Sequence, residues 1–298
     1  MGKRVTGIKG KRMLTALMSM IMALALVMVF DVTVLAADEG IGWKLDDEGT
    51  LIVTGGGSNG VLKYIDSNDA KKWEAHKDEI ITIKIEGNVT TIKDNVFKGY
   101  SKVKTVELAD TVTEIGVSAF AECPELTTIK FSANMQKIRQ KAFQKCTALA
   151  EVTIPKTVVS ISGETTGPFA NCTGLTTVTF ENGLTEIPDR MFKDCLSITT
   201  IKWPEGLTTI GSFAFQNARD YTVGSLPATV TAVKTDAFEG CKDTSFTVPK
   251  NMTTFQHPFG HLTEISFEEG TTKIPDNCCE SVTTLKKINW PANVTEVG

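Results

Sequence analysis

Seven phenylalanines recur at a nearly constant spacing, and this repeat constrains the fold more than any other feature of the sequence. The intervals between them are 23, 23, 26, 23, 23 and 23 residues. An internal period of roughly 20 to 50 residues is typical of solenoids and related repeat architectures. The recurring residues are Phe97, Phe120, Phe143, Phe169, Phe192, Phe215 and Phe238.

Other positions keep the same period. An Ile or Val lies five residues before most of the phenylalanines, and a Cys lies three residues after five of them, with Tyr100 and Ala218 as the exceptions. The longer interval reflects three extra residues within residues 162–167, an insertion confined to one repeat. The recurring cysteines are Cys123, Cys146, Cys172, Cys195 and Cys241.

Each unit predicts two short strands and a turn. In residues 128–131, polar and apolar side chains alternate, which is the period of a half-buried strand. A second extended segment follows, as in residues 207–210. We expect one short helical turn around the Phe and Cys, with Asp94, Asp189 and Asp276 capping the free amides at its start.

A unit of this length cannot bury its apolar side alone, so neighbouring units must stack and share one core. The sequence therefore predicts an α/β repeat solenoid built from short strands and short helical turns. Strands about 4.8 Å apart give a rod roughly 40 Å long for about nine layers. We expect equivalent positions to form ladders of Phe on Phe, Ile on Ile and Cys on Cys.

The order of these residues resembles the BspA-like, or Treponema pallidum type, leucine-rich repeat. The pattern has Leu, Ile and Phe or Ile before a Pro, then Val and Ile, then Ala-Phe and a Cys; it is clearest at residues 126–146 and 198–215. The resemblance covers residues 84–298 and implies a right-handed leucine-rich repeat coil. It also implies a secreted or cell-surface bacterial protein, often an adhesin, with no catalytic residues and no cofactor.

The N-terminal part predicts two further segments. A basic start, an uncharged run over residues 13–30 and small residues near Ala36 and Ala37 predict a secretory signal over residues 1–37, cleaved after Ala36 or Ala37. An uncleaved membrane anchor is the alternative. Residues 38–83, with Trp43, Leu45 and a Gly-rich stretch, resemble the small β-hairpin cap that precedes such arrays. We expect secretion or exposure at the cell surface.

The repeat becomes less regular toward the C-terminus. Phe259 follows Phe238 after 21 residues, and Cys279 lies 20 residues further on, where a Phe is expected. The sequence then stops just before the next Ala-Phe pair is due. We therefore expect the array of residues 84–298 to be truncated, with any attachment to the membrane lying in the signal or in a missing anchor.

The charge of the chain argues against nucleic-acid binding. The 31 basic and 35 acidic residues give a net charge of -4. Removing residues 1–37 takes away five basic residues and one acidic residue, which leaves 26 against 34, or -8. A nucleic-acid-binding domain is expected to carry a basic patch or stripe.

The cysteines permit two interpretations. Secretion favours disulfides between ladder neighbours, whereas a ladder continued by Tyr100 and Ala218 favours buried thiols that act as small apolar side chains; we favour the second. A zinc site of Cys278, Cys279, His257 and His261 is disfavoured, since adjacent cysteines lack the usual ligand spacing. We expect no metal site. The Gly-rich residues 55–60 lack a phosphate-loop ending and predict a hairpin turn.

The outward positions of the longer strands form the candidate binding surface. One interpretation is a solvated face in which Thr reflects strand propensity. The other is an extended docking surface of the kind that solenoids present. The residues are Thr105, Glu107, Thr128, Lys130, Glu151, Thr153, Thr177, Thr179, Thr200, Lys202, Glu264, Ser266, Lys287 and Asn289.

These observations favour a non-enzymatic protein that binds a protein ligand, such as a host matrix component or another cell-surface protein. A structural spacer that displays a missing C-terminal part is one alternative. A carbohydrate-binding module of a larger surface protein is another, although Trp203 and Trp290 fall at positions expected to point inward. The ligand and the oligomeric state stay open.

Overall fold

The computed structural model describes residues 41–55, 63–158, 160–161 and 165–298. The predicted signal over residues 1–37, most of the predicted Gly-rich turn and part of the insertion lie outside these residues. Within the described residues, no helix has the length and apolar character needed to cross a membrane.

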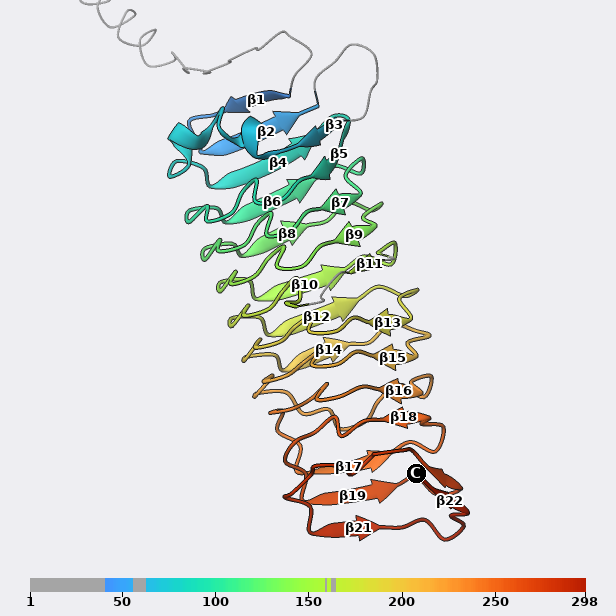
Figure 1. Cartoon of the computed structure of the whole chain (residues 1–298). Helices are drawn as coiled ribbons and strands as arrows, with labels where there is room; N and C mark the ends of the chain where they lie inside the picture. Colours follow the sequence, from blue (N-terminus) through green and yellow to red (C-terminus); the bar gives the residue numbers. More distant parts are fainter. Residues whose placement is uncertain (1–40, 56–62, 159, 162–164) are drawn as a thin grey trace, which may run out of the picture.

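The chain winds into a stack of flattened coils, most of which add one longer and one shorter strand (Figure 1). We call the side of the longer strands the front face and the side of the shorter strands the back face. The front strands are β4 (Thr82–Glu86), β6 (Thr105–Leu108), β8 (Thr128–Lys130), β10 (Glu151–Ile154), β12 (Thr177–Phe180), β14 (Thr200–Lys202), β17 (Ser245–Val248), β19 (Glu264–Phe267) and β21 (Lys287–Asn289). The back strands are β3 (Lys63–Ile65), β5 (Val89–Ile92), β7 (Glu114–Ile115), β9 (Lys137–Ile138), β11 (Ser160–Ile161), β13 (Glu186–Ile187), β15 (Thr209–Ile210), β16 (Ala232–Val233), β18 (Thr254–Phe255), β20 (Lys273–Ile274) and β22 (Glu296–Val297).

Consecutive coils pair in parallel with equivalent residues opposite each other. On the front face, Thr105 pairs with Thr128 and Val178 pairs with Ile201. The front strands, together with β1 (Gly42–Leu45) and β2 (Thr50–Thr54), form the sheets β1-β2-β4-β6-β8, β10-β12-β14 and β17-β19-β21. The back strands form β11-β9-β7-β5-β3, β13-β15-β16-β18 and β20-β22. This register is the one expected when a repeat is stacked upon itself. It confirms the predicted solenoid.

A continuous stack of aromatic rings lies inside the coils. Neighbouring phenylalanine rings lie 5.2 to 5.7 Å apart and are tilted by at most 24°. Trp73 extends the stack at one end and Phe259 extends it at the other. All of these rings are fully buried. The predicted Phe ladder is therefore confirmed.

The predicted helical turn around each Phe is wrong. The described helical segments, α2 (Ser67–Ala70) and η2 (Glu74–His76), both precede the repeats. Residues two positions before and after the ring have left-handed backbone, as in Ser118 (φ 54°) and Glu122 (φ 61°) on either side of Phe120. Such residues interrupt an α-helix. The solenoid is therefore built almost entirely from strands and turns.

The backbone hydrogen bonds explain why no helix forms there. We call the loop around each repeat phenylalanine a Phe loop; the first one spans residues 95–99. Alternate amides of each Phe loop donate to the next coil, as Phe97 N–H does to the Ala119 carbonyl at 2.8 Å. Equivalent bonds join Phe192 to Ala214 and Phe215 to Ala237. In an α-helix, each of these N–H groups would instead donate to the carbonyl of the residue four positions earlier in the same segment. The Phe loops thus form a third line of contact between coils.

The predicted helix caps are also corrected. Asp94 Oδ1 accepts a hydrogen bond from Val117 N–H at 2.7 Å, and Asp189 Oδ1 accepts one from Ser212 N–H at 2.8 Å. Each amide belongs to the following coil and not to a helix in the same coil. These aspartates therefore join coils together.

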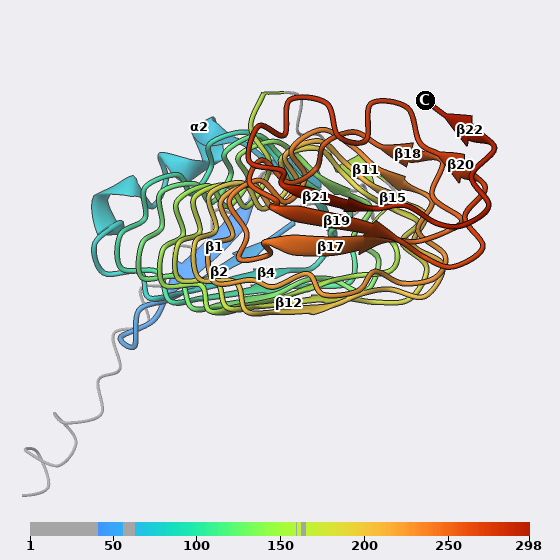
Figure 2. The ribbon, with the colours of Figure 1, turned by 90° about the horizontal axis from the view of Figure 1, so that it is seen from below.

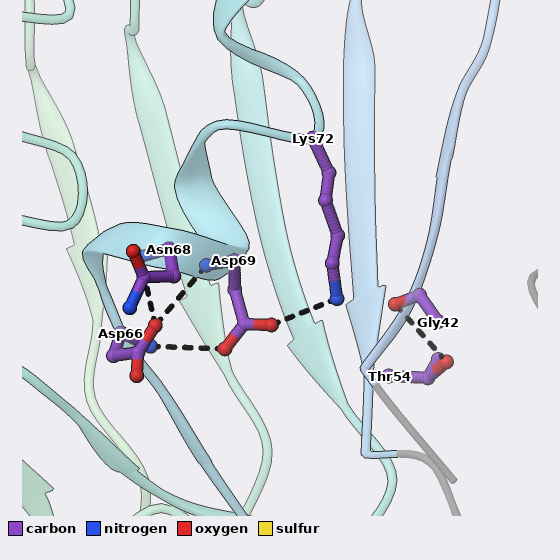
Figure 3. Close-up of polar contacts among 6 residues, drawn as sticks. All are labelled: Gly42, Thr54, Asp66, Asn68, Asp69 and Lys72. Carbon is purple, nitrogen blue, oxygen red and sulfur yellow. Dashed lines mark hydrogen bonds and ion pairs between the residues drawn. The ribbon is translucent and has the colours of Figure 1, made fainter. Parts of the chain in front are cut away.

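The first coil carries an antiparallel pair. β1 (Gly42–Leu45) pairs antiparallel with β2 (Thr50–Thr54), and β2 continues the front sheet in parallel with β4. Figure 3 shows the hydrogen bond from Thr54 Oγ1 to the Gly42 carbonyl at 3.4 Å. It also shows the capping box of α2, in which Asp66 Oδ1 accepts from Asn68 and Asp69 amides. The hairpin therefore covers the N-terminal edge of the front sheet.

The front sheet is interrupted between β14 and β17. The intervening coil passes through residues 221–224 without forming a strand. The carboxylate of Asp243 accepts hydrogen bonds there from Val223 N–H at 2.8 Å and Gly224 N–H at 3.2 Å. Along the axis, β17, β19 and β21 are offset from β12 (Figure 2). The stack therefore changes alignment at this coil.

Candidate binding surface

All of the predicted site residues lie on front strands and are half-exposed or exposed. They alternate with buried side chains, as Glu151 and Thr153 alternate with Val152 and Ile154 in β10. Parallel register places them in two columns along the axis. One column runs through Glu151, Thr177 and Thr200, and the other through Thr153, Thr179 and Lys202. The structure therefore brings them onto one face, on three separate sheets.

Two ion pairs join charged side chains of this face. Lys84 Nζ lies 3.7 Å from Glu107, and Lys287 Nζ lies 2.9 Å from Glu264. Asn289 Nδ2 also donates to Glu264 Oε1 at 2.6 Å. Hydrogen bonds from Lys287 and Asn289 lower the pKa of the exposed Glu264 carboxyl below its usual value. These pairs neutralise charge at two places along the face.

Threonines on and beside the front face fall into two groups. Those just before a strand bond to the preceding coil: Thr127 Oγ1 donates to the Lys104 carbonyl at 3.1 Å, and Thr176 Oγ1 to the Ala150 carbonyl at 3.0 Å. The threonines within the longer front strands of the repeats form no such hydrogen bond to the preceding coil. Within the described part of the chain, no side-chain hydrogen bond is formed by the hydroxyls of Thr105, Thr153, Thr177, Thr179 and Thr200. This second group is free to bond to a ligand.

A hollow of about 410 Å³ opens on the same face at the sheet interruption. The predicted residues Glu264 and Ser266 line it. Asp243 also lines it, with only 6% of its surface exposed. The remaining lining residues are Thr222, Gly224, Ser245, Phe246 and Thr247. The hollow is thus a mainly polar depression rich in hydroxyl groups.

Several lining residues were missed by the sequence reasoning. Ser245 and Thr247 occupy the same two columns as Glu264 and Ser266, and the alternation over residues 245–248 was a sufficient signal. Asp243 had a weaker signal. Six residues after the Phe, the earlier coils carry a large apolar or aromatic side chain, whereas Thr244 stands there after Phe238; the earlier residues are Val103, Leu126, Leu149, Leu175, Ile198 and Tyr221. That loss of an apolar layer marks the interruption.

The tryptophan prediction holds at one position only. Trp203 is half-buried, and its ring packs 6.4 Å from Phe180 and 5.6 Å from Phe215. Trp290 was expected to point inward, but 55% of its surface is exposed. The ring of Phe267, from the preceding coil, covers just one side of it at 6.0 Å.

The cysteines agree with the interpretation in which the thiols are buried apolar side chains and form no disulfides. The described cysteines are all free, and most ladder thiols donate to the Phe carbonyl of an earlier coil, as Cys172 Sγ does to Phe143 at 3.1 Å and Cys195 Sγ to Phe169 at 3.1 Å. Among the described residues, no three or more His, Cys, Asp or Glu side chains gather in a group able to hold a metal.

A second hollow, of about 300 Å³, lies beside Trp43, Asp46 and His76 in the first coil.

Several solved structures are similar to this chain. One from Eubacterium ventriosum is 18% identical over 86% of this chain and 84% of its own, with a TM-score of 0.52. A Treponema pallidum leucine-rich repeat protein (20% identity, 61% and 88% coverage, TM-score 0.39) and the pneumococcal vaccine antigen PcpA (16% identity, 90% and 87% coverage, TM-score 0.40) also match. No curated protein matches the sequence.

The repeats also match a family description. The BspA type leucine-rich repeat region aligns with residues 75–167, 165–260 and 257–298, in six copies. These matches cover most of the chain and coincide with the stacked coils. The protein belongs to the BspA-type leucine-rich repeat family.

Proposed function

We propose that this protein is a non-catalytic binding protein that docks a partner protein on its front face. Leucine-rich repeat proteins commonly mediate protein–protein interactions, which supports the assignment. The observation that carries it is the set of unbonded hydroxyls at Thr105, Thr153, Thr177, Thr179 and Thr200. Structural threonines in this chain bond to the neighbouring coil, whereas these point outward in register.

The face is suited to docking because it is rigid. Each strand is hydrogen-bonded to its neighbours, and the β-branched Thr side chain has few rotamers to lose. Binding to such a surface costs less ordering entropy than binding to flexible side chains. The hollow beside Asp243 and Ser266 adds a depression that a protruding partner side chain can enter.

We also propose that the protein acts outside the cytoplasm, either secreted or at the cell surface. The N-terminal sequence supports this location, with cleavage after Ala36 or Ala37. In the same proposal, residues 38–83 are the cap and residues 84–298 the binding array. N-terminal sequencing of the exported protein tests the cleavage position.

The docking test replaces five outward side chains together: Thr128, Lys130, Thr177, Thr179 and Lys202. Thr→Lys and Lys→Glu changes at these positions should abolish binding to immobilised matrix proteins and to cell surfaces, while circular dichroism stays unchanged. A matched variant alters Lys137, Glu186 and Thr209 on the back face and should bind normally. Unchanged binding by the front-face variant would refute the docking face and favour a structural spacer.

A further inference from the structure

The Phe loops near the middle of the array concentrate positive charge in an acidic protein. The third to sixth Phe loops contain four basic residues and one acidic residue, Asp194, which gives a charge of +3; these loops span residues 141–145, 167–171, 190–194 and 213–217. The seventh Phe loop, residues 236–240, contains two acidic residues and no basic one. We call the four basic residues the basic edge: Lys141, Lys145, Arg190 and Lys193.

Backbone hydrogen bonds hold the basic edge on one line along the axis. Lys145 N–H donates to the Ala170 carbonyl at 3.1 Å, and Asn171 N–H donates to the Lys193 carbonyl at 2.9 Å. Successive rings of this stretch lie 5.2 and 5.3 Å apart, so the two cationic loops are separated by two coils. This separation is comparable with the Debye length, about 8 Å at physiological ionic strength, so their fields reinforce each other.

Most of the basic edge has no carboxylate partner. Glu122, in the preceding loop, lies 3.8 Å from Lys98, and Asp194 Oδ1 accepts a hydrogen bond from Asn217 Nδ2 at 2.7 Å. These carboxylates are therefore held by other groups. Three cations form no ion pair and no side-chain hydrogen bond within the described part of the chain: Lys141, Lys145 and Lys193.

The fold does not require these side chains. Lys141, Lys145 and Arg190 have left-handed backbone, with φ of 59°, 62° and 58°. Asn adopts this conformation more readily than Lys or Arg. Equivalent positions in other coils carry Asn with the same backbone, as at Asn95, Asn171 and Asn217. Asn at the basic edge would therefore suit the backbone at least as well, and folding alone does not account for the cations.

The aromatic side chains of this region favour recognition by charge. Phe213 is half-exposed, and Arg190 Cζ and Lys193 Nζ lie 4.7 and 5.6 Å from its ring centroid. The other rings of these four loops are buried. Single-stranded nucleic acids need aromatic rings on which bases stack, and protein interfaces rely on apolar or aromatic anchors. The half-exposed ring is already in contact with cations, so a ligand meets mainly charge.

We propose that the basic edge binds a linear anionic polysaccharide whose sulfate or carboxylate groups repeat along the polymer. Such a polymer, lying along the axis, contacts residues 141–145 and 190–194 together, whereas a small anion reaches one loop at a time. The site is separate from the front face and does not depend on protein docking there. Both sides of the edge are covered by further coils, so the surface belongs to the interior of the array.

The test uses the whole chain and fluorescently labelled heparin, a linear sulfated polysaccharide, with single-stranded DNA of equal charge for comparison. Fluorescence anisotropy gives the affinity at about 50 and about 200 mM salt. We expect heparin to bind more tightly than the DNA. The logarithm of its affinity should fall linearly with the logarithm of the salt concentration, as for other ligands held by ion contacts.

The edge variant combines three changes, Lys141→Asn, Lys145→Asn and Arg190→Asn. Its affinity for heparin should fall at least about tenfold at low salt, because three of the four cations are removed. Its melting temperature should stay unchanged or rise, because Asn suits the left-handed backbone. A structural role for these cations would instead lower the melting temperature.

A matched control removes the same amount of charge elsewhere, through Lys130→Gln and Lys202→Gln on the front face and Lys137→Gln on the back face. It should bind heparin as the wild type does, which would also separate the basic edge from docking on the front face. The proposal would be overturned by an equal loss of heparin affinity in both variants, by a wild type that does not bind heparin at low salt, or by DNA binding as tight as heparin binding.

Discussion

At the scale of single residues, aspartate and glycine are matched across neighbouring coils. Asp94 and Gly116, Asp189 and Gly211, and Asp276 and Gly298 are each separated by 22 residues. A Cβ added to Gly211 would lie 2.5 Å from Asp189 Oδ1 and 2.6 Å from Asp189 N. The glycine is therefore required by the aspartate that folds over it, and not by its own backbone angles.

The pairing predicts the outcome of substitution. Gly211→Ala should reduce the free energy of unfolding by about 1 to 3 kcal/mol, because the Cβ meets backbone as well as the carboxylate. Asp189→Ala in the same chain should recover part of this loss, since one of the close contacts is then absent. Urea denaturation of the single and double variants measures the coupling.

The control uses the same repeat position in the next coil. Lys234 stands where Gly211 stands, and the residue facing it from the preceding coil is Ser212 in place of an aspartate. Lys234→Ala should change stability by less than about 0.5 kcal/mol, because its ion pair with Glu186 is exposed. Equal losses in Gly211→Ala and Lys234→Ala would contradict the pairing rule.

At the scale of elements, the loops and the thiol ladder hold the coils where no sheet does. Most ladder thiols donate to a Phe carbonyl of an earlier coil. Burial raises the pKa of the Cys172 and Cys241 thiols. The folded chain thus keeps these groups protonated at a pH where the unfolded chain releases their protons.

This difference sets a pH dependence of stability. An ordinary thiol ionises near pH 8.5, so the stabilisation is complete below that pH and falls as the pH rises above it, by up to about 1.4 kcal/mol per pH unit for each group. Cys172→Ala should make this decline shallower. Urea denaturation at about pH 7.5 and about pH 10 measures the slope. A decline equally steep in the variant would show that other groups, such as Tyr221, cause it.

The interruption of the front sheet depends on one carboxylate. Asp243→Ala should lower the free energy of unfolding by about 2 kcal/mol, because the amides of Val223 and Gly224 lose their acceptor in a buried site. Asp243→Asn keeps one acceptor oxygen and should cost less. Asp220→Ala, at an exposed carboxylate one coil earlier, should be nearly neutral. Thermal unfolding compares the three, and equal stability of all variants would mean that Asp243 does not hold this coil.

At the scale of the whole molecule, each coil contacts chiefly its neighbours, so stability varies along the axis. Phe192 and Phe215 amides donate to the following coil at 2.8 Å. For the Phe259 amide, no carbonyl among the described residues accepts. Coils near the last strands are therefore held by fewer bonds than those near β12 and β14.

Hydrogen exchange should show this gradient. We expect the Phe259 amide to exchange at least about tenfold faster than the Phe192 amide, even though both rings are buried. Native-state exchange followed by peptide mass spectrometry resolves the two loops. Equal protection of both amides would contradict the expected gradient and would mean that the stack opens as one cooperative unit.

Much of the fold could be predicted from periodicity alone. The spacing of Phe97, Phe120 and Phe143 requires a stack, because only equivalent positions in successive coils can bury rings at that interval. Alternation over strands such as Thr177–Phe180 also assigns the outward side chains. The failure at the Phe loops has a clear cause. Left-handed residues such as Glu122 and Lys145 carry no sequence mark that distinguishes them from helix formers.

The candidate site, like the fold, could be predicted from the sequence only in part. The sequence by itself determined that the chain is a solenoid and which side chains face outward, because a two-residue period and a 23-residue period both depend on local order. Only the tertiary structure decided that Thr177 and Thr179 keep free hydroxyls while Thr176 does not, that Asp243 opens a hollow, and that Trp290 is exposed. Each of these depends on which atoms of the neighbouring coil lie within hydrogen-bonding or packing distance, and that distance is set by how the coils stack.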